Sequence, residues 1–422
     1  MKPLAGLLLK EPGSGFVRDT LKLGAGMALG QAVMLAVLPL WSRLYGPADF
    51  GRYGVWTAVA GIAAILLTLR LDSCIVIASD DAQANALVRL CLWLALGGGA
   101  VLALAAWAAP ASWRAGIGAA TLGDWLPLAV LGGALTAIVA TLQHAANRQR
   151  AYWRMSMSRV ALALAAALVG SVLGAAGVAS GLLVAALVGS LASWGVLAGT
   201  SGTGAPRPRV AEMAQAVRAH ADAPRYLWPS ALLDVVTQQL PLLLIVAWYS
   251  QEVAGQFSLA WRVLALPLFM VAGAASSVFY QRMAALAQQP QRARVLLLHT
   301  WRLFALLGAL PALLVAFWGA ELFALLFGAP WRPAGRMAEI LMPLLWVMFV
   351  SSPTSTSLIV LGLQKWSPLF GLALLACRPL AFCLGARFGS IEAGLHAWVL
   401  AEIAVIVLYN LLILRCLGHR GR

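Results

Sequence analysis

The sequence predicts an all-α polytopic membrane protein with twelve transmembrane helices, and its composition, charge-free stretches and turn signals are the observations that predict it. Of the 422 residues, 62% are hydrophobic and only 11% are charged, whereas soluble domains contain about 25% charged residues. Long stretches such as 23–42, 90–113 and 340–364 contain no Asp, Glu, Lys or Arg. A membrane span needs about 20 mostly apolar residues, and these stretches are long enough. Because lipid offers no hydrogen-bond partners, the backbone of a span must form its hydrogen bonds internally, so we expect helices there.

Turn signals divide the apolar stretches into individual helices. Gly-Pro and Asp at 46–49 separate the first two helices, and the small-residue stretch 174–181 divides the 47 charge-free residues 160–206. The polar segment 201–226 is expected to link an N-terminal lobe, 1–200, to a C-terminal lobe, 227–422, with six helices in each. The expected helices cover about residues 21–42, 53–76, 90–109, 125–144, two within 160–206, two within 228–282, 302–319, 337–361, 368–386 and 393–414.

The two halves contain similar segments. Leu-Pro-Leu at 38–40 matches Leu-Pro-Leu at 240–242, and FGRYGVWTAV at 50–59 is similar to AGQFSLAWRV at 254–263. The offsets of 202 and 204 residues require a small gap. Many transporters are built from such repeats, although short apolar matches also arise by chance in so hydrophobic a chain.

The formal net charge of +15 reflects membrane topology, not a nucleic-acid partner. With twelve helices, 21 of the 30 Lys and Arg residues fall on the side that holds both termini, and six fall on the other side. Cytoplasmic loops carry an excess of Lys and Arg, so we predict that both termini are cytoplasmic. The first 20 residues show no signal-peptide pattern, so we expect them to form a retained cytoplasmic tail.

The sequence predicts no catalytic residue, metal site or cofactor. The five cysteines have neither CxxC nor metal-ligand spacing. Phosphate-binding loops, nucleophile elbows and HExxH motifs are absent, and the acidic pair at 80–81 stands alone in a loop.

Three segments carry a resemblance to a known family. They are LPLWSRLYGPADFGRYGVWTAVAGIAAILLTLRLDSCIVIA at 38–78, QLPLLLIVAWYSQEVAGQFSLAWRVLALPLFMVAGAASSVFYQR at 239–282 and LFGAPWRPAGRMAEILMPLLWVMFVSSPTSTSLIVLGLQ at 326–364. The chain resembles bacterial oligosaccharide flippases of the Wzx type, in the multidrug/oligosaccharidyl-lipid/polysaccharide exporter superfamily. The resemblance implies two six-helix lobes around a central cavity that opens alternately to each side.

The resemblance also implies a substrate and a location. The cavity would pass a polyprenyl-diphosphate-linked oligosaccharide outward across the bacterial inner membrane, for O-antigen, lipopolysaccharide or exopolysaccharide synthesis. Membrane lipid and the polysaccharide polymerase machinery would be the other partners. Protons, sodium ions or the membrane potential remain open as the driving force.

Arginines are the candidate diphosphate contacts, because their guanidinium fork suits phosphate oxygens. Arg262 lies about seven residues, or roughly 10 Å, beyond a turn in an apolar helix, with snorkelling to the interface as the alternative. Arg70 could contact phosphate, anchor the topology or pair with Asp72. Arg43 and Arg52 flank the first outer loop and could receive the head group on release, or simply be solvated there.

Polar residues form two further candidates. Gln31 and Asp234 fall at similar repeat positions, and Asp234, Gln238 and Gln239 would give one helix a polar face for sugar hydroxyls. Asp234 could also carry a coupling ion, and interhelical hydrogen bonding is the alternative for this face.

The last two helices contain a further pair of charged residues. Arg378 and Glu402 lie about ten and nine residues from the turn between these helices, so a buried structural ion pair is expected. A proton-linked carboxylate is the alternative.

Two other functions compete with a flippase. A drug–cation antiporter of the same superfamily would need an acidic cavity, which Arg262 opposes. A membrane glycosyl polymerase or ligase would need a large outer loop, but the longest expected outer connections, 110–124 and 320–336, have only about 15 residues.

Overall fold

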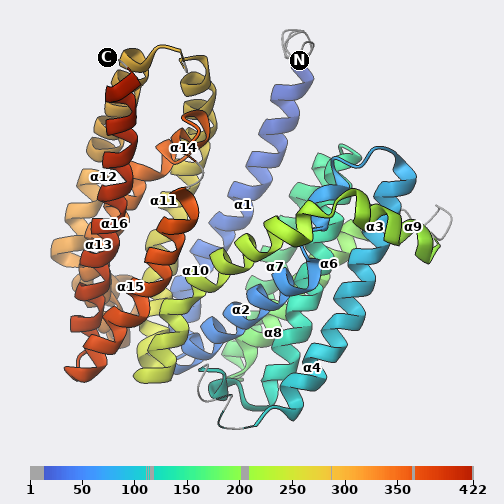
Figure 1. Cartoon of the computed structure of the whole chain (residues 1–422). Coiled ribbons are helices and arrows are strands. Elements are labelled where there is room, and N and C mark those ends of the chain that lie inside the picture. Colours follow the sequence, from blue (N-terminus) through green and yellow to red (C-terminus); the bar gives the residue numbers. More distant parts are fainter. Residues whose placement is uncertain are drawn as a thin grey trace. The chain divides into compact units, whose positions relative to one another are not determined.

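The computed structural model describes residues 14–110, 112, 114, 118–200, 209–286, 288–363 and 366–420, and every regular element in them is a helix (Figure 1). Twelve helices in these ranges are long and apolar enough to cross a membrane. The predicted fold class is therefore confirmed. Within the expected linker, residues 201–208 lie outside the described residues.

The described elements follow one another without strands. Up to Thr200 they are α1 Ser14–Leu44, α2 Pro47–Thr68, η1 Asp72–Ile75, α3 Asp81–Trp93, η2 Leu94–Gly98, α4 Gly99–Ala108, η3 Ala119–Trp125, α6 Leu126–Arg148, α7 Tyr152–Ala175, α8 Gly181–Leu197 and η4 Ala198–Thr200. After it they are α9 Val210–Ala219, η5 Ala223–Leu227, α10 Trp228–Trp248, α11 Gln251–Ala285, α12 Pro290–Phe327, η6 Ala329–Trp331, α13 Arg332–Ser351, η7 Ser352–Thr354, α14 Ser357–Val360, α15 Ser367–Arg387 and α16 Ile391–Arg420.

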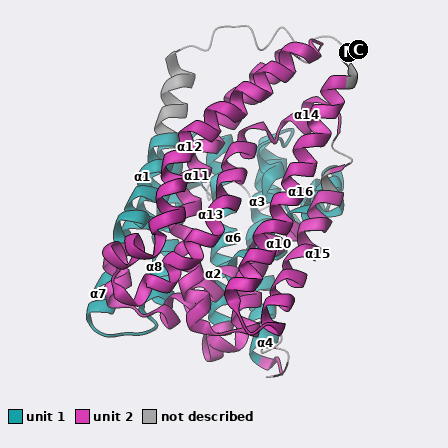
Figure 2. Ribbon diagram, turned by 90° about the vertical axis from the view of Figure 1, so that its left-hand side faces the viewer, with its two compact units in different colours: residues 1–37, 60–107, 127–231 teal, residues 38–59, 108–126, 232–422 magenta. Residues whose placement is uncertain are grey.

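The chain forms two compact units (Figure 2). Unit 1 contains residues 1–37, 60–107 and 127–231, and unit 2 contains residues 38–59, 108–126 and 232–422. The end of α1 and the start of α2 thus belong to the same unit as the C-terminal helices. The two sequence lobes remain a prediction about chain organisation.

Unit 1 packs its helices through small residues. Gly189 on α8 faces α7 so closely that a Cβ there would lie 2.8 Å from the carbonyl oxygen of Leu162. The helix α9, within the expected linker, packs on α3 and buries Ala216 in a cluster with Met213 and Val217. This apolar face at helical spacing explains why part of the linker is folded.

The helix α2 ends earlier than the apolar pattern indicates. We expected a helix over about 53–76, but α2 ends at Thr68 because Leu69 and Arg70 adopt left-handed conformations, with φ of 49° and 58°. Non-glycine residues rarely adopt this conformation, which costs energy. The short helix η1 follows and turns Asp72 into the interior of unit 1.

Unit 2 contains a long kinked helix, α12, where we expected a helix over 302–319 and a connection over 320–336. The helix continues to Phe327, and Trp318 marks its kink with φ of −132°. A kink leaves a backbone N–H without its acceptor in the helix. Here the N–H of Ala320 donates a hydrogen bond to the Glu339 carboxylate on α13, at 2.8 Å. A side chain on a neighbouring helix therefore permits the kink, which sequence spacing could not indicate.

The starts of α2 and α11 cross at two glycines. A Cβ on Gly255 would lie 1.7 Å from the carbonyl oxygen of Pro47, and a Cβ on Gly51 would lie 2.0 Å from that of Gln251. The Gln251 amide also donates to the Ala48 carbonyl at 2.6 Å. The two glycines are separated by 204 residues, as are Pro47 and Gln251, so the contact is reciprocal and follows the offset of the sequence repeat.

The helices α15 and α16 bury a charged pair. The Arg378 guanidinium donates to both oxygens of Glu402, at 3.1 and 2.7 Å, and the two residues are only 6% and 2% exposed. Arg378 also donates to the Thr237 carbonyl, and the indole of Trp398 donates to Glu402. Such bidentate, fully bonded geometry is what allows two charges to lie away from water.

Replacing Gly255 by alanine should destabilise the folded protein, because the new Cβ has no space at the Pro47 carbonyl. Overpacking typically costs about 1–3 kcal/mol. The apparent melting temperature of purified Gly255→Ala should therefore fall below that of the wild type. Gly273→Ala is the matched control, since Gly273 lies on the same helix and no described neighbouring atom lies within 4 Å of the place that its Cβ would take. Equal melting temperatures for the two variants would contradict this packing.

Removing either partner of the pair should strongly reduce the folded protein in the membrane. Arg378→Gln or Glu402→Gln leaves one buried charge, which costs about 3–5 kcal/mol. The charge-swapped double variant should recover only in part, since it cannot restore the bonds with Thr237 and Trp398. Fluorescence-detected size exclusion of membrane extracts measures the folded fraction. A double variant whose loss equals the sum of the two single losses would show that the two residues do not stabilise one another.

Candidate functional site

Arg262 lies half-buried on α11 with its guanidinium over an aromatic ring. Its Cζ is 4.7 Å from the centroid of the Tyr53 ring on α2, and both residues belong to unit 2. Among the described residues, no carboxylate lies within salt-bridge distance of it. A cation–π contact contributes about 0.5–1 kcal/mol at exposed sites and about 2 kcal/mol or more when desolvated. The charge is therefore held in place without being neutralised.

Two further predicted arginines flank the same region of unit 2. Arg52 is half-buried on α2, next to Tyr53, and Arg43 is exposed in the last turn of α1. A cation there is favoured by the partial negative charge of the helix C-terminus. Both side chains lie on segments that border the α2–α11 crossing.

The polar face predicted on α10 is present. Asp234 and Gln238 are exposed, and the Gln238 amide donates to the Asp234 carboxylate at 2.9 Å. Gln239 is half-buried. Hydroxyl-bearing ligands can bond with such a carboxylate–amide pair, which still has free donor and acceptor capacity.

The remaining two predicted residues, Gln31 and Arg70, are in unit 1. Gln31 is half-buried on α1. Arg70 is half-buried at the end of α2, and its Nε is buried without a hydrogen-bond partner in the described part of the chain. Among the described residues Arg70 forms no salt bridge with Asp72, which instead lies 3.6 Å from His144.

A set of contacts around the α2–α11 crossing was not predicted from sequence. The Trp331 indole donates to the Ser42 carbonyl at 2.8 Å, and the Ser42 hydroxyl donates to the Phe327 carbonyl at 3.1 Å. The Trp331 and Phe50 rings meet edge to face at 4.8 Å. Gln256 bonds to the backbone of η6 and α13 at 2.9 and 3.0 Å. We call these contacts among 42–51, 251–256 and 327–334 the interlock.

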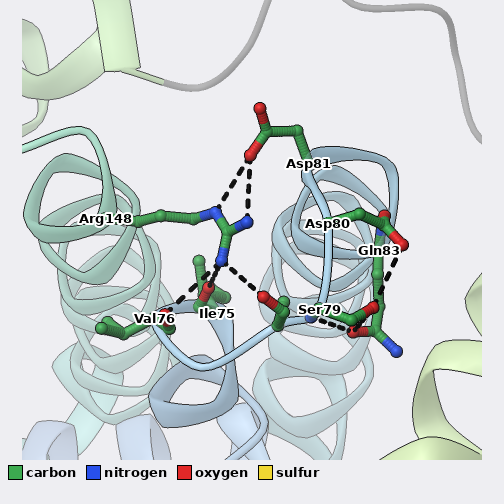
Figure 3. Close-up of polar contacts among 8 residues, drawn as sticks. Ile75, Val76, Ser79, Asp80, Asp81, Gln83 and Arg148 are labelled. Carbon is green, nitrogen blue, oxygen red and sulfur yellow. Dashed lines mark hydrogen bonds and ion pairs between the residues drawn. The ribbon is translucent and has the colours of Figure 1, made fainter.

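A second unpredicted cluster surrounds Arg148 in unit 1 (Figure 3). Its guanidinium donates to Asp81 at 3.0 and 3.2 Å and to the carbonyls of Ile75, Val76 and Ala78 at 2.8–3.5 Å. Arg148 thus provides hydrogen-bond donors for backbone carbonyls at the end of η1 and directly after it. It also lines a cavity of about 700 Å³ in unit 1.

The described residues offer no metal site. No group of three or more His, Cys, Asp or Glu side chains in them is placed to hold an ion.

Comparison with solved structures shows the fold. The chain is similar to an inward-facing multidrug resistance transporter of the MATE family in the MOP superfamily, at 14% identity and a TM-score of 0.68, over 95% of this chain and 98% of that one. It is also similar to the lipid II flippase MurJ, at 10% identity and a TM-score of 0.70, over 96% and 90%. A MOP superfamily transporter from Pyrococcus furiosus matches at 14% identity and a TM-score of 0.57, over 96% of each chain.

Sequence comparison shows the family. No curated protein sequence matches the chain significantly. Residues 40–336, well over half of the chain, match the profile of a family described as polysaccharide biosynthesis protein. This range contains the interlock, Arg262 and the polar face of α10. The chain therefore belongs to this polysaccharide biosynthesis family, and it has the fold of the MOP superfamily structures that it resembles.

Proposed function

We propose that the protein is a flippase that moves a polyprenyl-diphosphate-linked oligosaccharide from the cytoplasmic to the periplasmic face of the inner membrane. The observation that carries this proposal is Arg262, a half-buried cation without an acidic partner among the described residues, held over the Tyr53 ring. A substrate anion is the partner that such a charge lacks. A diphosphate would provide two or more oxygens that accept hydrogen bonds from the Arg262 guanidinium.

Membership in a polysaccharide biosynthesis family supports a sugar-bearing substrate. Similarity to a lipid II flippase supports a lipid carrier for that sugar. We assign the diphosphate to Arg262 and the sugar to Asp234, Gln238 and Gln239 of the same unit, whose amides and carboxylate suit hydroxyl groups.

The interlock is the proposed outer gate. The excess of Lys and Arg on the loops that accompany the termini favours a periplasmic position for the interlock. Release of substrate would require the Gly51–Gly255 crossing to open, since its backbones are in direct contact. Arg43 and Arg52 border that exit, and Arg70, two residues after the end of α2 at Thr68, would lie toward the cytoplasmic side.

With this orientation both termini would be cytoplasmic, and the polysaccharide polymerase machinery would be a further candidate partner at the opposite, periplasmic face. A drug–cation exporter of the same superfamily is less well supported, because Arg262, which has no acidic partner among the described residues, would repel cationic drugs. A glycosyl polymerase or ligase is less well supported, because the solved structures with this fold are a multidrug transporter and a lipid II flippase.

Deleting the gene should abolish one surface or secreted polysaccharide and leave its lipid-linked repeat unit on the cytoplasmic face. The reason is that polymerisation follows translocation, so a blocked flippase traps the precursor. Extraction and mass spectrometry of lipid-linked intermediates, together with polysaccharide analysis, measure both. Normal polymer in a strain without a redundant flippase would be decisive against the proposal.

For Arg262 the charge should matter more than the bulk of the side chain. Arg262→Gln and Arg262→Ala should lose transport by about 10- to 100-fold, the equivalent of a hydrogen bond to a charged group. Arg262→Lys should retain part, because a point charge attracts phosphate without the bidentate fork. Polysaccharide per unit of membrane protein in the complemented deletion strain is the measurement.

Arg282→Gln is the matched control for this series, because Arg282 is an exposed arginine at the far end of the same helix. It should support normal transport. If Arg262→Gln produces wild-type polymer at normal abundance, Arg262 is an interface anchor.

A further inference from the structure

Unit 1 contains a buried carboxylate that lacks the hydrogen bonds such a group normally has. Asp72 is 3% exposed, and its Oδ1 has no hydrogen-bond partner among the described residues. Its Oδ2 lies 3.6 Å from Nε2 of His144 on α6. That distance is within ion-pair range but too long for a hydrogen bond. The carboxylate therefore depends on the charge of one histidine.

The backbone of unit 1 is strained where it presents this carboxylate. Two consecutive non-glycine residues, Leu69 and Arg70, are left-handed, with φ of 49° and 58°. Such conformations persist only where the surrounding structure maintains them, and they concentrate at functional sites. The result is a break in α2 that directs Asp72 toward α6. The His144 side chain is 33% exposed and that of Asp72 only 4%, so protons reach the pair through the imidazole.

The elements packed around the pair contain few other groups that could set its charge. The other titratable and charged side chains on η1, α3, α6, α9 and the end of α2 are Arg70, Cys74, Asp81, Arg89, Cys91, Arg148, Glu212, Arg218 and His220. Arg148 and Asp81 are paired with each other. Burial raises the pKa of the Cys74 thiol, which therefore stays neutral near pH 7. The charge of His144 is affected most by burial and then by the charges of Asp72 and Arg70.

A proton bound by His144 would stabilise the buried Asp72 carboxylate. A buried, ionised carboxylate without hydrogen bonds is costly, and a histidine is the side chain that changes charge between about pH 5 and 8. When the imidazole takes a proton from water, the imidazolium becomes a donor and counter-ion for Asp72. When it returns the proton to water, the pair is neutral histidine and anionic carboxylate again. The positive charge of Arg70 opposes uptake and so keeps it reversible.

We infer that Asp72 and His144 form a proton-binding site and that the proton exchanged there is the ion coupled to transport. The coupling rests on the proposed flippase function, whereas the proton site itself does not. Asp234, the sequence-based candidate for a coupling ion, differs in being exposed and already bonded to Gln238.

The proton site can be measured without any substrate. The chain has five histidines, so isotope-labelled histidine in protein reconstituted into nanodiscs gives a small set of imidazole NMR signals, and His144→Gln identifies that of His144. At pH 6.5, Asp72→Asn should lower the ratio of imidazolium to imidazole at His144 about tenfold or more, because an anionic neighbour is removed. Arg70→Gln should raise it. The exposed His299 and His396 are internal controls and should not change.

The coupling is measured in the complemented deletion strain, normalised to membrane protein. His144→Gln and Asp72→Asn should each reduce polysaccharide about 5- to 150-fold, the usual range of coupling between sites. His144→Lys separates the two possible roles. A merely structural cation is replaced by lysine, whereas a site that must gain and lose a proton is not, so His144→Lys should fail as His144→Gln does.

The outcomes distinguish the two proposals. An unchanged His144 signal in Asp72→Asn overturns the proton site and leaves the flippase untouched. Wild-type polymer from His144→Lys, or from His144→Gln at normal abundance, overturns the coupling. Normal polymer in the deletion strain itself overturns the flippase, while the NMR measurement still decides the proton site.

Discussion

Polar groups inside a membrane protein must find partners within the protein, and this constraint shapes much of the described structure. The Arg378–Glu402 pair makes further hydrogen bonds with the Thr237 carbonyl and the Trp398 indole. The kink in α12 is tolerated because Glu339 accepts the freed N–H. A charged group that lacks such partners therefore carries information. Arg262 has an aromatic ring where a carboxylate is expected, and Asp72 has a histidine beyond hydrogen-bond distance.

Close backbone contact is the second constraint, and it connects the sequence repeat to the interlock. Gly51 on α2 leaves space for a carbonyl at the start of α11. Gly255 on α11, 204 residues later, leaves space for a carbonyl at the start of α2. Repeats related by a pseudo-two-fold axis produce such reciprocal contacts, as an isologous interface does between identical subunits. The Phe50 and Trp331 side chains beside the crossing are almost fully buried, so opening a gate here would expose apolar surface as well as break hydrogen bonds.

Sequence alone could predict the features that depend on local composition. Apolar length predicted twelve spans, and glycine and proline marked most turns, because lipid imposes the same requirement on every helix. Composition could not predict the early end of α2, since Leu69 and Arg70 carry no turn signal, nor the α12 kink, whose cause is Glu339 on another helix. The candidate site residues divide in the same way, into those that local composition indicates and those that depend on a residue distant in sequence. Arg262 was conspicuous in its apolar stretch, but neither Tyr53 beneath it nor His144 beside Asp72 lies near its partner in sequence.

The nature of Arg262's neighbour suits a residue that must bind and release an anion in turn. A carboxylate partner would stabilise the guanidinium strongly and would have to be displaced, leaving a costly charge, each time a phosphate entered. A tyrosine ring attracts the cation through its quadrupole, remains neutral and keeps the guanidinium edges free for oxygen acceptors. The same cation can therefore contact the ring with its face and a diphosphate with its fork. The ring holds the guanidinium in position between transport cycles, through an attraction that is weaker than that of a substrate anion.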